Sequence, residues 1–157
     1  MKQENYVVSS VHLKMVRERK KLYCEETLTS PQSVAKMVDS LFKDLDREKM
    51  ILISVNANLE PVAYEIIAVG GTSSCTIDIK SIFKHALLAN ATGIIVVHNH
   101  PSLNPRPSVD DERITEKIKQ AGKFLDVELI DHIVFGTVDQ FYSFKQHDWK
   151  IERGETA

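Results

Sequence analysis

Two histidines separated by one residue stand at a point where a metal site can form. His98 and His100 follow residues 93–97, a short apolar run typical of a strand that is buried on both faces. Because side chains two positions apart on a strand point the same way, both imidazoles can address one point. Asp111, in the first turn of the next predicted helix, can add a carboxylate oxygen. Three such ligands with a fourth position left to water are the arrangement of a catalytic zinc site.

The segment between these ligands also has a purely structural interpretation. Residues 101–107 contain three prolines, which stiffen the loop at low entropic cost. Ser108 and Asp111 match a helix capping box, in which Asp111 would only satisfy a backbone amide. A His-x-His pair at the end of a strand is weak evidence for a metal when it stands alone. The combination of two histidines, a rigid loop, a serine and a carboxylate nevertheless favours a metal, since burying these groups without a purpose is costly.

The elements that must position these side chains follow from apolar periodicity. Ser30 can cap a first helix and Pro31 suits its first position. Residues 50–55 form an apolar run of strand length, and residues 62–69 follow after a turn, so the two runs predict a hairpin. The apolar face of the first helix is predicted to hold Val34, Val38, Leu41, Phe42 and Leu45.

Two more helices and two more strands are predicted after this hairpin. Asp78 can cap a second helix, and a third helix is expected from about Ser108 to Leu125. Residues 127–135 and 141–144 are predicted to be strands. The fold class is therefore α/β: a mixed β-sheet flanked by helices, with three layers in the simplest packing.

The chain is predicted to form one domain. Residues 30–146 make up this domain, and residues 147–157 form a carboxy-terminal tail. Residues 1–29 precede it as a segment packed on the domain, with a predicted strand at 6–13 and a basic stretch at 14–21.

Composition excludes several classes of protein. Apolar residues make up 43% and charged residues 27% of the 157 residues, which is the balance of an ordinary globular protein. A net charge of -2 gives no overall attraction to nucleic acid or an anionic membrane. The two cysteines, Cys24 and Cys75, provide neither a disulfide framework nor a four-cysteine zinc site. With no signal peptide and no membrane span in the sequence, the reducing cytoplasm is the expected compartment.

The metal-site residues resemble a known family. The pattern H-x-H-P-x6-S-x-x-D, which begins at His98, is the motif of the MPN+/JAMM metalloproteases. The longer string HNHPS…P-x-P-S-x-x-D, followed by Asp131-His132 and the stretch 142–144, is similar to RadC-type proteins. This resemblance runs from about residue 30 to residue 144.

The resemblance implies a fold akin to the cytidine deaminases and a zinc ion held at His98, His100 and Asp111. It further implies that Ser108 stabilises an oxyanion and that Glu48, just before the first central strand, acts as general base for a zinc-bound water. The substrate expected from the family is a peptide or protein. The open alternatives for the base are Glu60 and Glu65.

This sequence departs from the RadC pattern in two places. Leu103 stands where those proteins usually carry glycine, at a loop position that can require a positive φ; leucine there costs on the order of 1 kcal/mol. The helix-hairpin-helix region of full-length RadC proteins has no counterpart among these residues. His12, His85 and His147 lack the spacing of ligands, whereas His132 matches the family string without an assigned role.

Three functions are compatible with these features. The first is a zinc metallopeptidase or isopeptidase, which the complete ligand set favours. The second is a DNA-repair-associated protein, which only the basic stretch 14–21 supports. The third is a non-catalytic scaffold of the MPN type, which the complete ligand set argues against.

Nucleic-acid binding provides a first prediction. Because the net charge is -2, we expect DNA binding to be weak and to fall steeply with salt concentration. An anisotropy titration at physiological salt measures this directly. Sub-micromolar, sequence-specific binding would contradict the prediction and favour the DNA-associated function.

Overall fold

Five strands form one mixed sheet in the computed structural model, which describes residues 8–18, 22, 24, 26–43, 46–70 and 77–150. The strands lie in the order β2-β1-β3-β4-β5, so β3 is central. All seven residues of β3 are buried, as its continuous apolar run predicts. The strands are β1 (Lys49–Val55), β2 (Pro61–Val69), β3 (Gly93–Asn99), β4 (Glu128–Thr137) and β5 (Gln140–Ser143).

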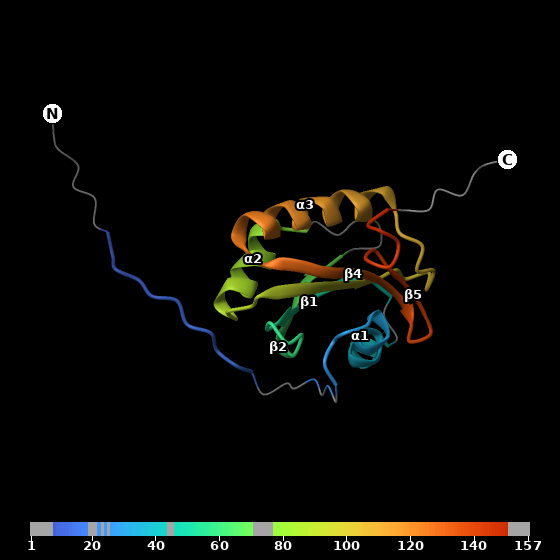
Figure 1. The fold of residues 1–157 in the computed structure, drawn as a ribbon, viewed down its shortest axis with the longest axis horizontal. Helices are drawn as coiled ribbons and strands as arrows, with labels where there is room; N and C mark the ends of the chain where they lie inside the picture. Colours follow the sequence, from blue (N-terminus) through green and yellow to red (C-terminus); the bar gives the residue numbers. More distant parts are fainter. Residues whose placement is uncertain are drawn as a thin grey trace.

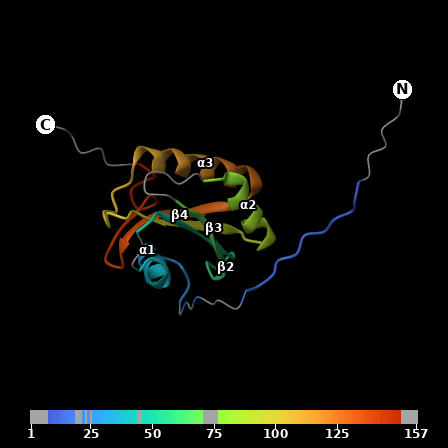
Figure 2. The ribbon, with the colours of Figure 1, turned by 180° about the vertical axis from the view of Figure 1, so that it is seen from behind.

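Helices cover both faces of this sheet and produce three layers (Figure 1). The helix α1 (Pro31–Val38) packs on one face, and α2 (Ile79–Leu88) and α3 (Val109–Leu125) lie on the other, as the view from behind also shows (Figure 2). The apolar side chains of β1 and β3 alternate between these two cores. None of the helices in the described residues is long and apolar enough to cross a membrane.

Strand pairing brings distant parts of the chain to one end of the sheet. β1 runs antiparallel to β3 with Met50 opposite His98, so the start of β1 lies beside the end of β3. β3 and β4 are parallel, with Val96 opposite His132, and α3 makes the connection between them. The carboxyl end of β3 therefore meets both the segment before β1 and the amino terminus of α3.

The predicted α/β fold is confirmed, including the hairpin of β1 and β2, the central strand and the three capped helices. Side chains of Ser30, Asp78 and Ser108 accept hydrogen bonds from backbone amides in the first turn of their helices. The regular part of the first helix is shorter than its apolar pattern. It ends at Val38 and tightens into the 3₁₀ turn η1 (Asp39–Leu41), while Leu45 lies outside the described residues.

The strand predicted at residues 6–13 is wrong for its described part. Residues 8–13 are extended but pair with no described strand, and Val8, Val11 and Leu13 are 89%, 82% and 76% exposed. Alternating apolar residues favour a strand only where a sheet edge is there to pair with them, and this segment lies away from the sheet (Figure 1). Residues 6 and 7 lie outside the described part.

The carboxy-terminal segment makes more contacts than a tail would. Trp149 packs against the core between the sheet and α3, and the Lys119 ammonium lies 4.4 Å from the centre of its ring. The His147 ring stacks on Tyr142 with the ring centres 4.1 Å apart. Residues as far as Trp149 therefore belong structurally to the domain.

The loop after β3 contains the strained position that the sequence indicates. Leu103 has a φ of 58°, in the left-handed region that favours glycine. Its carbonyl oxygen packs against Gly136 of β4, where a Cβ atom would approach that oxygen to 2.5 Å. Leu103 also donates its amide to the His100 carbonyl oxygen at 2.9 Å. The left-handed residue thus closes the turn that follows the second histidine.

Replacing this leucine tests the strain. Leu103→Gly should raise the free energy of unfolding by up to about 1 kcal/mol, because relief of the left-handed penalty exceeds the entropy that glycine adds to the unfolded chain. Leu87→Gly is the matched control, since Leu87 is exposed to a similar degree but lies in α2. It should lower stability by about 1 kcal/mol. Urea denaturation measures both, and equal losses for the two variants would contradict the strain.

Candidate metal centre

Three side chains converge at the carboxyl end of β3: His98 on the strand, His100 just after it and Asp111 in α3. His98 Nε2 lies 3.1 Å from His100 Nε2 and 3.1 Å from Asp111 Oδ1. The distance from His100 Nε2 to Asp111 Oδ2 is 3.3 Å. His98 is almost completely buried and Asp111 is 8% exposed, so the point where they converge is shielded from water. The pattern of residues thus places its three predicted ligands around one point.

These separations fit the donor set of a zinc ion. Two ligand atoms that are each about 2.0–2.1 Å from a tetrahedral zinc are about 3.3–3.4 Å apart. The 3.1 Å between the two histidine Nε2 atoms is close to this spacing, as are the 3.1 Å from His98 Nε2 to Asp111 Oδ1 and the 3.3 Å from His100 Nε2 to Asp111 Oδ2. Two imidazole nitrogens and a carboxylate oxygen also match the chemistry that zinc prefers.

Electrostatics prepares the carboxylate for a cation. Burial acts to raise the pKa of Asp111, but its close polar contacts with His100 and His98 outweigh this effect and hold that pKa far below its ordinary value. The contact with the Asp111 carboxylate raises the pKa of His100 against the opposing effect of burial. Asp111 is therefore ionised throughout the physiological range of pH.

Asp111 serves in the capping box and in the cluster at the same time. Its Oδ2 atom accepts hydrogen bonds from the backbone amide and the hydroxyl of Ser108, each at 2.7 Å. Ser108 Oγ in turn accepts the Asp111 amide at 3.1 Å. Oδ1 remains directed at His98. The structural and the functional interpretation of this pair are thus both compatible with one conformation.

Glu48 reaches the same cluster from the segment before β1. Its Oε1 atom lies 3.7 Å from His100 Nε2, and its side chain is more exposed than that of Asp111. Ligand atoms of Glu48, His98 and His100 all lie within 4.8 Å of one another, so Glu48 is also close enough to hold a metal. Asp111 is nearer to both histidines, which favours Asp111 as third ligand and leaves Glu48 beside the site.

The two other candidate bases lie elsewhere. Glu60 accepts a hydrogen bond from the Asn56 side chain at 2.6 Å in the turn between β1 and β2. Glu65 is exposed on β2, opposite Leu52 of β1. Glu48 is therefore the glutamate that the fold brings to the metal site.

Asn99 holds the Glu48 segment in place, a role that the sequence did not reveal. Its Oδ1 accepts the Lys49 amide at 2.8 Å, and its Nδ2 donates to the Arg47 carbonyl oxygen at 3.0 Å. These two bonds bracket Glu48 from either side. Asn99 lies between His98 and His100 in the chain and is 3% exposed, so its amide fastens the neighbouring segment to the end of β3.

Behind the ligands, His132 connects β3 to α3. His98 Nδ1 lies 2.9 Å from His132 Nε2, and His132 Nδ1 lies 2.6 Å from Thr115 Oγ1. The Thr115 hydroxyl donates to the Asp111 carbonyl oxygen at 2.5 Å. Burial, with no exposed surface, lowers the pKa of His132 well below its ordinary value, so this ring is neutral.

Asp131, the neighbour of His132 in the family string, has a separate structural function. Its carboxylate accepts the Ser143 hydroxyl at 2.6 Å and the Lys145 amide at 3.0 Å. Burial raises the pKa of Asp131 above its ordinary value. The side chain fastens β4 to the turn after β5.

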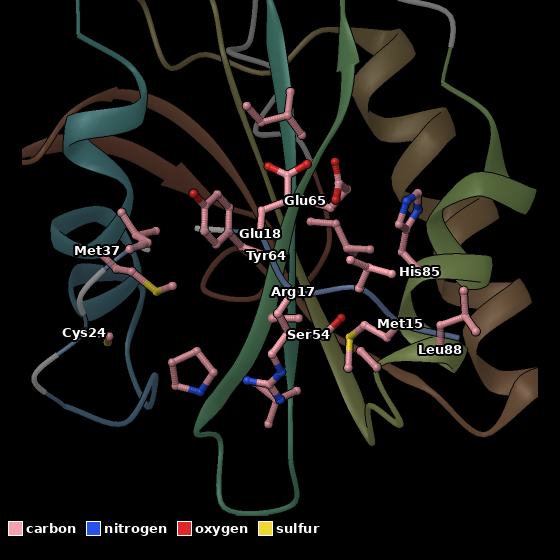
Figure 3. A pocket seen from close by; sticks show the side chains of 18 of the residues that line it. Met15, Arg17, Glu18, Cys24, Met37, Ser54, Tyr64, Glu65, His85 and Leu88 are labelled. Atoms are coloured by element: carbon pink, nitrogen blue, oxygen red, sulfur yellow. The ribbon is translucent and has the colours of Figure 1, made fainter. Parts of the chain in front are cut away.

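His98, His100 and Asp111 lie in a cleft between β1 and α3. The wall of this cleft also includes Ile77, Ile114 and Lys117. A larger hollow lies along β2 (Figure 3). Cys24, Met37 and Tyr64 line it toward α1, and His85 and Leu88 line it toward α2. Glu48, His98, His100 and Asp111 all line the first cleft, and none of them lines this hollow.

Loss of the Asn99 amide should loosen the Glu48 segment. Asn99→Ala removes two hydrogen bonds to backbone groups and should lower the free energy of unfolding by about 1–3 kcal/mol. Hydrogen exchange of the Lys49 amide should accelerate, because that amide loses its acceptor. Asn56→Ala, which also removes bonds to backbone amides but at the opposite end of β1, is the matched control. If hydrogen exchange of the Lys49 amide is unchanged in Asn99→Ala, the Asn99 side chain does not hold the Glu48 segment in place.

Comparison with known proteins identifies the family of this chain. A family model described as a RadC-like JAB domain matches residues 28–149. A UPF0758 protein of Clostridium perfringens is 36% identical over 121 residues, which cover 77% of this chain and 53% of that protein. A UPF0758 protein of Thermotoga maritima is 39% identical over 102 residues, which cover 65% and 46% of the two chains.

A UPF0758 protein of Rubrobacter xylanophilus is 31% identical over 120 residues, or 76% of this chain and 52% of that protein. The chain thus spans about half the length of the curated relatives that it matches. The family model covers most of the chain, including His98, His100 and Asp111. This protein therefore belongs to the RadC-like JAB domain family.

Proposed function

We propose that this protein is a zinc-dependent hydrolase that cleaves peptide or isopeptide bonds. The observation that carries the proposal is the convergence of His98, His100 and Asp111 at zinc-like spacing with the Glu48 carboxylate beside them. The two imidazoles and the Asp111 carboxylate would hold the metal. This donor set leaves a coordination position for water, as catalytic sites do and structural sites do not.

Each remaining group has one chemical task. Zinc, when bound, supplies Lewis acidity, which makes water more acidic and polarises a carbonyl oxygen. Glu48 takes a proton from the attacking water and delivers it to the leaving nitrogen as the carbon–nitrogen bond breaks. Ser108 donates a hydrogen bond to the developing oxyanion, for which its hydroxyl must turn from Asp111 toward the substrate.

The surroundings of the cluster support a polypeptide substrate. The cleft wall combines apolar side chains, among them Met50 and Ile114, with charged ones such as Arg113 and Lys117. A segment of polypeptide presents this same mixture of apolar and charged groups. The neighbouring position of a general base and an oxyanion donor fits attack on an amide carbonyl.

The alternative functions have less support. Attachment to DNA rests on the basic stretch, whose described residues include Lys14 and Arg17 but also Glu18. A scaffold needs no metal ligands, whereas His98, His100 and Asp111 converge on one point.

The metal provides the primary test. Purified protein should contain about one zinc ion per chain, because one three-ligand set is available. His100→Ala and Asp111→Asn should lose the metal and keep the fold, since catalytic sites contribute less to folding than structural ones. Glu48→Gln is the matched control and should keep the metal. Elemental analysis and circular dichroism measure the two properties. Well-folded wild-type protein that binds no zinc would overturn the proposal.

The base provides a second test, with a library of peptides and isopeptides as substrates. Glu48→Gln should lower turnover by about 10²-fold or more, because a general base contributes on that scale. Glu65→Gln should change turnover little, since Glu65 lies on β2 outside the cleft. If Glu48→Gln cleaves as fast as the wild-type protein, Glu48 is not the base.

A further inference from the structure

We propose that His132 and Thr115 are positioning residues that fix the tautomer of His98, so that its Nε2 atom is always the free ligand atom. This inference rests on the proposed metal site and adds the groups that prepare it. The hydrogen bonds form an unbroken chain from His98 through His132 and Thr115 to the backbone of Asp111. The series of hydrogen bonds ends at the Asp111 carbonyl oxygen, and this acceptor determines which atom donates in each bond.

The chain ends on a group that can only accept. Thr115 Oγ1 lies 2.5 Å from the Asp111 carbonyl oxygen, and the hydroxyl carries the one proton that can lie between these two oxygens. With its proton committed, Thr115 must accept from His132 Nδ1 at 2.6 Å. His132 therefore carries a proton on Nδ1.

The position of the proton on His132 determines the position of the proton on His98. It is 0% exposed, its ring stacks on Phe144 with the centres 5.1 Å apart, and both ring nitrogens are engaged by Thr115 and His98. The described hydrogen bonds of this fully buried ring go to a histidine and a threonine and not to a carboxylate, so nothing compensates a positive charge there and the ring is neutral. A neutral ring with its proton on Nδ1 has a bare Nε2, which must accept. The donor 2.9 Å away is His98 Nδ1. His98 Nε2 is thereby left with its lone pair toward His100 and Asp111.

The second histidine reaches the same state by a shorter route. His100 Nδ1 lies 3.0 Å from the Asn104 carbonyl oxygen, which fixes a proton on Nδ1 and frees Nε2. His98 lies inside the sheet and has no such carbonyl beside it among its described contacts, so His132 and Thr115 extend the chain to one on α3. Partners of this kind orient metal-binding histidines and tune their affinity.

Thr115→Val tests the chain with a nearly isosteric change. Without the hydroxyl, His132 Nδ1 loses its acceptor; the ring then favours a proton on Nε2, which drives the His98 proton to Nε2 and blocks the ligand atom. We expect zinc affinity to fall by about 10–100-fold, the usual effect of removing such a partner. Thr115→Ser restores the hydroxyl and should restore affinity. Thr92→Val, which removes a hydroxyl bonded to the Val55 carbonyl oxygen far from the site, should change nothing.

Two measurements on the full chain decide the matter. Competition with a chromophoric chelator gives the zinc affinity of each variant. Long-range nitrogen–proton NMR on histidine-labelled wild-type protein reports the tautomers with and without zinc. The proposal expects a bare Nε2 on His132 and a protonated Nδ1 on His98 in both states. A proton on His132 Nε2 in the wild-type protein, or wild-type zinc affinity in folded Thr115→Val, would overturn it.

The same experiments separate this inference from the proposed function. Wild-type protein that binds no zinc contradicts the metal site, while the tautomers of the metal-free chain still decide the direction of the hydrogen bonds. Zinc binding with the opposite tautomer on His132 contradicts the inference alone. If Thr115→Val fails to fold, the tautomers of the wild-type protein still decide the proposal.

Discussion

The antiparallel pairing of β1 with β3 is the constraint on which the site depends. Its register sets Met50 opposite His98, and Asn99 then reaches across to the backbone on both sides of Glu48. A shift by one residue would turn every side chain of β1 to the other face of the sheet and exchange the two cores. The apolar residues of β1 alternate between those two cores. They therefore also determine where Glu48 lies relative to His98 and His100.

Near the end of β3, the buried polar side chains make polar contacts with one another. His98 and His132 are both almost inaccessible to water, and each ring nitrogen has a partner. Among the described residues, no buried side-chain nitrogen or oxygen lacks a hydrogen bond. Because an unpaired polar group in such a place costs about 1–3 kcal/mol, this full pairing gives the site one preferred arrangement.

Features that depend on neighbours in sequence were predictable, and features that depend on register were not. The apolar run of β3, the caps at Ser108 and Asp78 and the left-handed loop residue Leu103 are local patterns, and the structure contains all of them. Glu48 was predicted as general base from the resemblance to the family and not from a local pattern. The partners of Asn99 lie about fifty residues earlier in the chain, and those of His132 come from another strand and a helix. No spacing rule connects such residues before the sheet order is known.

The capping box at the start of α3 would also affect how a cation binds beside it. The amide and hydroxyl that hold one oxygen of Asp111 do so through the helix itself, so the ligand keeps its rotamer whether or not a cation is present. Little conformational entropy is then lost on coordination, and little structure is lost on release. A divalent ion could therefore enter and leave such a site without a change in the surrounding fold.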